Sequence, residues 1–199
     1  MPRIFQTPVP ALLPAEGSIR AFLVGEAPGP RGADQSGVPF WGDRAGLPVY
    51  RALEAAGCAG VPPEAYGDWD GARLKARGLW PTLRGVALGN ALDRCPTRDG
   101  EHFHAPTDRE LLAPENLTRL RRELLEITVR CPGTLRVVTL GRRAAWLFAH
   151  AGELPPHSLH ALPHPSAQGL LQAAPDKGRG LKLADLQAAW EGRLRELLG

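Results

Sequence analysis

The chain has 199 residues, of which 43% are hydrophobic and 23% are charged, and this balance excludes an intrinsically disordered protein. A chain of this length can bury the core of one domain. Its 23 glycines and 20 prolines form no regular repeat, which excludes a collagen-like fibre and predicts many turns and rigid loops.

The charged residues make the chain modestly basic. Lysine and arginine number 24 against 21 aspartates and glutamates, for a net charge of +3, and only Lys75, Lys177 and Lys182 are lysines. An excess of arginine can reflect the base composition of a genome. It also suits a nucleic-acid partner, because the guanidinium binds phosphate as a planar fork and stacks on bases. Both explanations stay open at this point.

The cysteines indicate the cellular setting. Cys58, Cys95 and Cys131 are odd in number and lack C-x-x-C spacing, so the sequence indicates neither a disulfide framework nor a zinc ribbon. No apolar run approaches the roughly 18 residues of a membrane span, and the N-terminus lacks the pattern of a signal peptide. We therefore expect a cytoplasmic protein that is not exported and has no membrane segment.

The N-terminal part of the chain begins with an extended arm. Four prolines in residues 1–18 forbid a regular helix or a central strand there. Residues 19–24 form a short apolar run that ends at Gly25, which predicts a buried parallel strand. After a long loop rich in glycine and proline, a helix is predicted over 47–56, with proline in its first turn and glycine past its end.

The middle of the chain is less regular. Residues 60–84 predict an irregular excursion with one helical turn over 72–77. The apolar run 86–88 predicts the second strand, which is followed by Asn90. A second irregular loop is expected over 93–106.

The C-terminal half alternates helices with strands. A capping box of the S/T-x-x-E form at 107–110 predicts a helix start. The further predicted elements are helices 114–130, 142–150 and 181–198 and strands 135–140 and 158–162. This alternation predicts a single domain over residues 1–199, with a three-layer α/β/α fold around a mostly parallel four-stranded sheet.

Polar segments follow three of the four predicted strands. Residues 25–46 follow the first strand, Asn90 follows the second, and the tripeptide HPS at 164–166 follows the fourth. Ligands of open α/β sheets bind beyond the carboxyl ends of the strands, so we predict the functional site at this edge of the sheet.

These segments resemble the uracil-DNA glycosylase superfamily. Within residues 25–46, the runs GEAPG, SGVPF and GDRAG are similar to the first motif of the bacterial family-four and family-five enzymes, and QSGVPF is also similar to the single-strand-selective monofunctional branch. Residues 164–166 match the second motif, and Asn90 with the CP at 95–96 resembles the strand-two motif. The resemblance spans residues 19–168.

One feature departs from families four and five, which usually hold an iron–sulfur cluster on four cysteines, two of them in a C-x-x-C near the N-terminus. Residues 1–20 contain no cysteine, so we expect neither a cluster nor another cofactor, with the arm in the cluster's structural role. A zinc site on Cys95, His102 and His104 is an alternative, although solvated loop histidines are the commoner case.

The resemblance implies a hydrolase that removes uracil from single- or double-stranded DNA and leaves an abasic site, as a monomer in base excision repair. The base would be flipped out of the stack. No lysine lies in the motifs to form a Schiff base, so we expect a monofunctional glycosylase. Two alternatives stay open: a glycosylase for hypoxanthine or xanthine, and a non-catalytic protein that binds damaged or single-stranded DNA.

The residues expected to bind the base follow from the motifs. Asn90 can pair with the N3–H and O4 of uracil, a face that cytosine reverses. Phe40 offers a flat surface for stacking. The resemblance also assigns Gly25, Ala27 and Ser166 to the base-binding site. The structural alternatives are an Asn90 that caps a turn and a Phe40 that belongs to the core.

The expected catalytic residues are one histidine and one of two carboxylates. His164 would donate to the uracil O2 as the base leaves as an anion. Family four carries an acid at the position of Glu26 and family five at the position of Asp43, and we favour Glu26 as the residue that positions water. Each residue also has a structural alternative. Glu26 could be a loop carboxylate that accepts hydrogen bonds from backbone amides, and Asp43 could equally be a partner for Arg44. His164 could be a structural histidine at a turn flanked by proline.

The segment after His164 combines apolar and cationic side chains. Such a segment could push a wedge into the base stack and hold phosphates. The residues expected to bind DNA are Gln168, Leu170, Leu171, Lys177 and Arg179. The alternative is that the two leucines pack under the last helix.

Overall fold

The computed structural model describes residues 3–199 and confirms the predicted fold class. Its main sheet has the strand order β5-β2-β7-β8, and every neighbouring pair is parallel. The strands are β2 (Ala21–Gly25), β5 (Val86–Asn90), β7 (Leu135–Leu140) and β8 (His157–Leu162). The three strands that are almost entirely buried, β2, β5 and β7, form the interior and one edge of this sheet.

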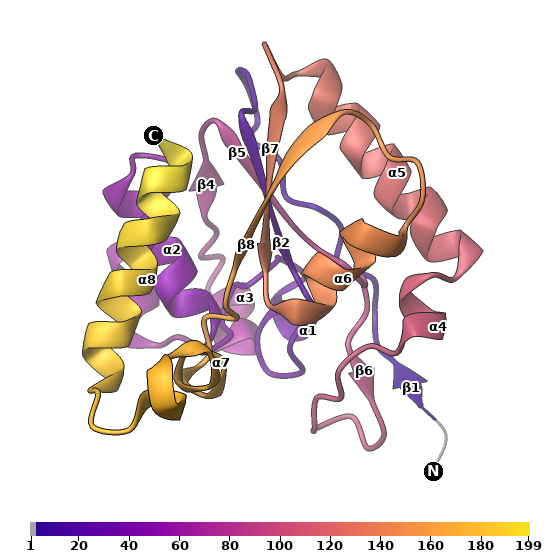
Figure 1. Ribbon diagram of the computed structural model, residues 1–199. Helices are drawn as coiled ribbons and strands as arrows, with labels where there is room; N and C mark the ends of the chain where they lie inside the picture. Colours follow the sequence, from indigo (N-terminus) through magenta and orange to yellow (C-terminus); the bar gives the residue numbers. More distant parts are fainter. Residues whose placement is uncertain (1–2) are drawn as a thin grey trace.

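Helices cover both faces of the sheet and make three layers (Figure 1). One face carries α2 (Gly46–Ala55) and α8 (Leu183–Leu198), and the other carries α5 (Pro114–Val129) and α6 (Arg142–His150). Each face has its own cluster of buried apolar side chains. Residues of β2 contribute to both clusters in alternation, because successive strand side chains point to opposite faces.

Short elements gather beyond the carboxyl ends of the strands. They are α1 (Ala33–Ser36), α3 (Gly71–Ala76), α4 (Asp108–Leu111), α7 (Ala167–Ala173) and η2 (Pro175–Gly178). The short helix η1 (Pro63–Gly67) lies beside α2 instead, where the Tyr66 hydroxyl donates to Glu54. The predicted helical turn at 72–77 is α3, while the excursion around it also holds a small hairpin of β3 (Ala59–Gly60) and β4 (Thr82–Leu83). The predicted capping box is present, because Thr107 and Glu110 exchange backbone and side-chain hydrogen bonds at the start of α4.

The N-terminal arm is extended, as predicted, and it also pairs with the rest of the chain. Its strand β1 (Ile4–Phe5) runs antiparallel to β6 (Pro96–Thr97). Leu12 and Leu88 exchange backbone hydrogen bonds of 2.8 and 2.9 Å, so the arm covers the outer edge of β5. Capping a free strand edge in this way protects it from pairing with other chains.

The segment after β8 differs from the sequence-based expectation of a loop. Residues 167–173 form the helix α7, whose first turn is capped by Ser166: the backbone N–H of Gly169 donates to its Oγ at 3.1 Å. The last helix begins two residues later than predicted, at Leu183. Within residues 3–199, no helix has the length and apolar character needed to cross a membrane.

Candidate functional site

The ends of β2 and β5 bring Gly25 and Asn90 side by side, since these two residues are register partners. Asn90 is 2% exposed, and its Nδ2 atom is buried without a hydrogen-bond partner among residues 3–199. Buried polar atoms are rarely unpaired in folded proteins, and an unpaired donor at a strand end has a ready explanation as a group kept for a ligand. Asn90 does not cap a turn with this donor.

Glycine is required at position 25 by the close approach of two side chains. A Cβ there would lie 2.7 Å from Oδ1 of Asn90 and 2.6 Å from Cε1 of Phe40. The amide and the aromatic ring therefore meet at one corner, as the sequence motifs predicted. Ala27, two residues further along the same loop, is half-buried and packs against the apolar cluster on the side of α5 and α6.

Phe40 is held in an unusual backbone conformation. Its φ of +64° lies in the left-handed region, which is uncommon for a bulky residue. Gly46, at the start of α2, packs on its backbone, because a Cβ there would come within 1.8 Å of the Phe40 carbonyl oxygen. Phe40 is 7% exposed and packs with the apolar cluster, so its ring is both a core residue and one wall of the corner beside Asn90. Such strain is typical of functional sites.

Glu26 is anchored at the N-terminus of α6. Its Oε1 atom accepts a 3.1 Å hydrogen bond from the backbone N–H of Arg143. The approach depends on Gly141, which has a φ of +100° and whose Cβ would lie 2.6 Å from the same oxygen. The fold therefore fixes one oxygen of this carboxylate at a helix N-terminus, where unpaired backbone N–H groups point outward.

His164 is oriented by its own turn. The backbone N–H of Ser166 donates to Nδ1 at 3.3 Å, and the Ser166 Oγ lies 2.9 Å from the same nitrogen. An Nδ1 atom that accepts leaves the proton on Nε2, where it can be donated to a ligand. Burial lowers the pKa of His164, while the negative charge of Glu26 opposes this shift, so the two side chains lie within electrostatic reach.

Asp43 ties down the loop that follows Glu26. Its Oδ2 atom accepts from the backbone N–H groups of Gly29 at 3.3 Å and Ala33 at 3.1 Å. Burial raises the pKa of its carboxyl to about 6. In the described part of the chain no ion pair joins Asp43 to Arg44, and it is Asp43 rather than Glu26 whose carboxylate accepts two loop amides.

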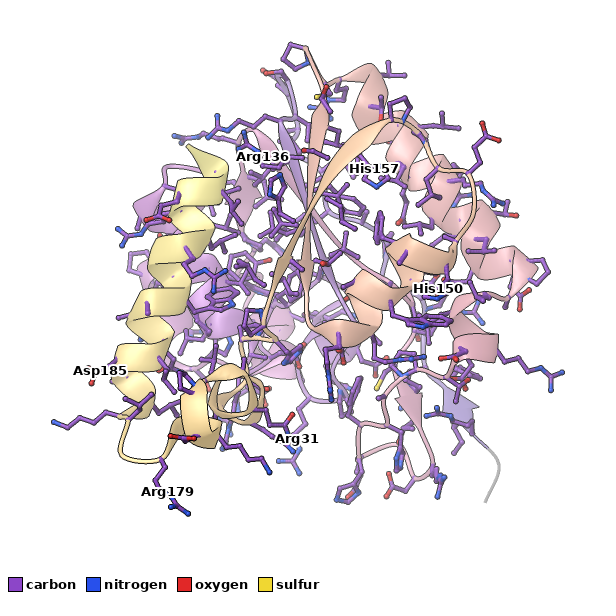
Figure 2. All side chains as sticks on the ribbon, viewed as in Figure 1. Arg31, Arg136, His150, His157, Arg179 and Asp185 are labelled. Atoms are coloured by element: carbon purple, nitrogen blue, oxygen red, sulfur yellow. The ribbon has the colours of Figure 1, made fainter. Side chains whose placement is uncertain are left out.

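The expected DNA-binding residues divide into exposed and packed side chains. Gln168, Lys177 and Arg179 are exposed, and Figure 2 shows Arg179 pointing away from the molecule near α7. Leu170 is 5% exposed and belongs to the apolar cluster under α8, so its expected place in a wedge is wrong in this structure. Leu171 is half-buried and contacts Gly178. Leu170 therefore packs under the last helix, as the alternative interpretation stated.

The motifs miss the contribution of the third strand. Gly141 and Arg143 follow β7 and reach Glu26, although neither residue belongs to a polar motif. Arg31, in the loop after β2, is exposed and points outward on the same side of the molecule as Arg179 (Figure 2). The glycine at the end of the third strand is the one signal in the sequence that could have indicated this contribution.

The cysteines do not fit an iron–sulfur cluster. All three are free thiols, Cys58 accepts a hydrogen bond from Arg20 at 3.3 Å, and within residues 3–199 no three potential metal ligands lie close enough together to hold a metal ion. Residues 3–199 contain no cluster of three potential ligands, so Cys95, His102 and His104 do not form the alternative zinc site. The arm runs beside Cys95 instead, with the Gln6 N–H donating to its carbonyl at 3.4 Å.

Comparison with known proteins found one family profile and one curated relative. A family profile described as "Uracil DNA glycosylase superfamily" matches residues 14–191, which include the ends of all four strands. The type-5 uracil-DNA glycosylase of Thermus thermophilus is 33% identical over 146 residues, or 73% of this chain. Those residues make up 56% of the relative, so the chain spans little more than half the length of the curated protein it matches.

Proposed function

This chain belongs to the uracil-DNA glycosylase superfamily, and from that membership and the strand-end site we propose that it hydrolyses the bond between uracil and deoxyribose in DNA. The product would be an abasic site in the DNA strand. The observation that carries the proposal is the buried, unpaired amide of Asn90 beside Gly25 and Phe40. A flat, polar base bound beside this amide would complete its hydrogen bonding.

Base recognition follows from the chemistry of that corner. The Nδ2 group of Asn90 donates to the uracil O4 and its Oδ1 accepts from N3–H, whereas cytosine presents the reverse pattern. The ring of Phe40 supports the flipped base by stacking, a contact worth about 1–3 kcal/mol for stacked single-stranded bases. Gly25 keeps the backbone of β2 close to the base, and Ala27 and Ser166 line the same site.

Bond cleavage uses His164 and Glu26. Water attacks C1′ of the deoxyribose, the C1′–N1 bond breaks, and its electron pair leaves on the uracil anion. The Nε2–H of His164 donates to O2 and stabilises that charge, an effect that a pre-oriented donor provides efficiently. Glu26 orients the water and accepts its proton. Asp43 supports this site by fixing the loop, through the amides of Gly29 and Ala33.

The reaction would stop at the abasic site. The lysines of the chain, Lys75, Lys177 and Lys182, lie outside the motifs, so no amine is available there to form a Schiff base with the sugar. The DNA strand would lie across the face that carries Gln168, Lys177 and Arg179, whose polar groups suit phosphate contacts. The protein would act as a monomer.

A base-release assay tests the proposal. Single- and double-stranded oligonucleotides with one uracil are incubated with the purified chain, and abasic sites are revealed by alkaline cleavage. We expect release of uracil and no strand cleavage before alkali. Release of hypoxanthine or xanthine without uracil would contradict the substrate, and binding without release of any base would contradict catalysis.

A further inference from the structure

A buried arginine of α5 clamps the peptide that carries Asn90. The guanidinium of Arg119 donates from Nη1 to the Asn90 carbonyl oxygen at 3.0 Å and from Nη2 to the Ala91 carbonyl oxygen at 2.8 Å. Only 10% of its side chain is exposed. None of the sequence motifs includes this residue.

Two further side chains of α5 hold Arg119 in place. Its Nη1 lies 2.6 Å from Oε2 of Glu123, whose side chain is 8% exposed, and its Nη2 donates to Oδ1 of Asn116 at 2.7 Å. The Asn116 amide in turn donates to the Ala91 carbonyl oxygen at 2.9 Å. The Ala91 carbonyl thus accepts from two side chains of one helix.

The opposite side of the same peptide is held by β2. The backbone N–H of Ala91 donates to the Gly25 carbonyl oxygen at 2.8 Å, and that of Leu92 donates to the Glu26 carbonyl oxygen at 3.0 Å. The peptide after Asn90 is therefore gripped from both sides. Among the residues that the structure describes, Nδ2 of the Asn90 side chain has no hydrogen-bond partner, so its position depends on the backbone that carries it.

We infer that Arg119 is a positioning residue for base recognition, which sets the Asn90 amide through the carbonyls of Asn90 and Ala91. This inference rests on the proposed function. A buried ion pair is a poor means of adding stability, because desolvation of both charges offsets their attraction. Arg119 donates two directed hydrogen bonds to backbone carbonyls and two to the side chains of Glu123 and Asn116, so one planar group fixes the backbone in space, and lysine cannot reproduce this geometry.

The test compares Arg119→Lys with a matched variant of the same helix. Arg121 lies two residues further on and also donates to two backbone carbonyls, those of Ala151 at 3.1 Å and Glu153 at 3.2 Å, after α6. The Arg121→Lys variant therefore controls for the loss of an arginine clamp outside the site. Arg119→Lys keeps a positive charge for Glu123, which avoids leaving a buried carboxylate unpaired.

The readout is base discrimination rather than activity alone. Affinity is measured for a single-stranded oligonucleotide with one 2′-fluoro-deoxyuridine, which resists hydrolysis, and for the same strand with cytosine there. We expect Arg119→Lys to reduce the ratio of the two affinities about tenfold and Arg121→Lys to leave it within about twofold of wild type. In an Asn90→Ala background, Arg119→Lys should change the ratio by less than about twofold, because both substitutions act through the side-chain amide of Asn90.

The outcomes separate this inference from the proposed function. An equal loss of discrimination in the presence and absence of Asn90, or equal effects of Arg119→Lys and Arg121→Lys, would overturn the role of Arg119. A wild-type chain without uracil release or discrimination would overturn the proposed function and this role with it. If Arg119→Lys folds poorly, the neutral pair Arg119→Gln with Glu123→Gln removes both charges, and the same loss of discrimination is expected.

Discussion

At the scale of single residues, Asn90 joins two properties that rarely coexist. It is almost fully buried, and its Nδ2 donor has no partner in the described part of the chain. An unpaired buried group costs about 1–3 kcal/mol. In the proposed function, a base that pairs with Asn90 would recover this free energy on binding, and the site would favour one hydrogen-bonding face.

This pairing predicts the effect of replacing the amide by a carboxylate. Asn90→Asp should lose uracil release by about 10²-fold or more, because the variant has no donor for O4. It should gain release of cytosine, whose amino group can donate a hydrogen bond to the carboxylate. Base-release assays on matched uracil and cytosine oligonucleotides measure both changes. Wild-type release of uracil by the Asp variant would remove Asn90 from the base-binding site.

Asp43 predicts a dependence of stability on pH. Because burial raises the pKa of its carboxyl to about 6, the folded state binds this proton more tightly than the unfolded state does. The associated stabilisation is complete below the unfolded pKa of about 4 and is lost as the pH rises through about 6. An asparagine at position 43 does not ionise, so the stability of Asp43→Asn should not fall in this way.

The variant should therefore gain stability relative to wild type between about pH 4 and about pH 7, by about 1–3 kcal/mol. Denaturant unfolding of both proteins at the two pH values measures the difference in unfolding free energy. The Asn variant keeps an oxygen that can accept from Gly29 and Ala33, so both proteins should fold. A difference that stays constant over this range would contradict a raised pKa at Asp43.

At the scale of elements, the N-terminus of α6 is what fixes Glu26. Gly141→Ala should displace the carboxylate, because the new Cβ would lie 2.6 Å from Oε1. We expect uracil release to fall about tenfold or more. Gly152 follows the C-terminal end of α6 and also has a positive φ, of +72°, but a Cβ added there would meet nothing else within 4 Å among residues 3–199.

Gly152→Ala is accordingly the matched control. Both variants place an alanine at a positive φ and should lower the melting temperature, Gly141→Ala by more, because the ψ of 164° at position 141 lies in a region that essentially only glycine adopts. Only Gly141→Ala should slow the chemistry. Equal rates of uracil release in the two variants would show that the position of Glu26 does not depend on this helix terminus.

The elements also show where sequence patterns succeed. The strands β2, β5 and β7 are short apolar runs with glycine at or near their ends, and such runs identify buried parallel strands. The helix α7 is not predicted because it has only seven residues and contains Gly169. In addition, its N-cap, Ser166, belongs to a motif that the sequence analysis assigns to a loop. A short helix with an internal glycine carries little periodicity to detect.

At the scale of the whole molecule, the predicted part of the site is the part that local motifs encode. Gly25, Phe40 and Asn90 do meet at one corner, since parallel strands align their carboxyl ends. Contacts between distant segments could not be predicted. Arg143 is 117 residues from Glu26, and its contribution is a backbone N–H that every residue except proline has.

Contacts within the fold also explain part of the excess of arginine in the sequence. Many guanidinium groups donate to backbone carbonyl oxygens and join distant segments of the fold. They belong to Arg3, Arg20, Arg119, Arg121, Arg130 and Arg136. Arg136 lies at the end of the molecule opposite Arg31 and Arg179, so only some arginines share the face of the proposed DNA site (Figure 2).

If the strand-end site releases the base with Glu26 as the residue that positions water, the rate of uracil release by Glu26→Gln is the most direct test. We expect turnover to fall by about 10²-fold or more, because the variant cannot accept the proton of the attacking water, while affinity for uracil-containing DNA stays within a few-fold of wild type. Asp43→Asn, measured beside it, should be mild. A wild-type rate for Glu26→Gln, or a larger loss for Asp43→Asn, would contradict this claim.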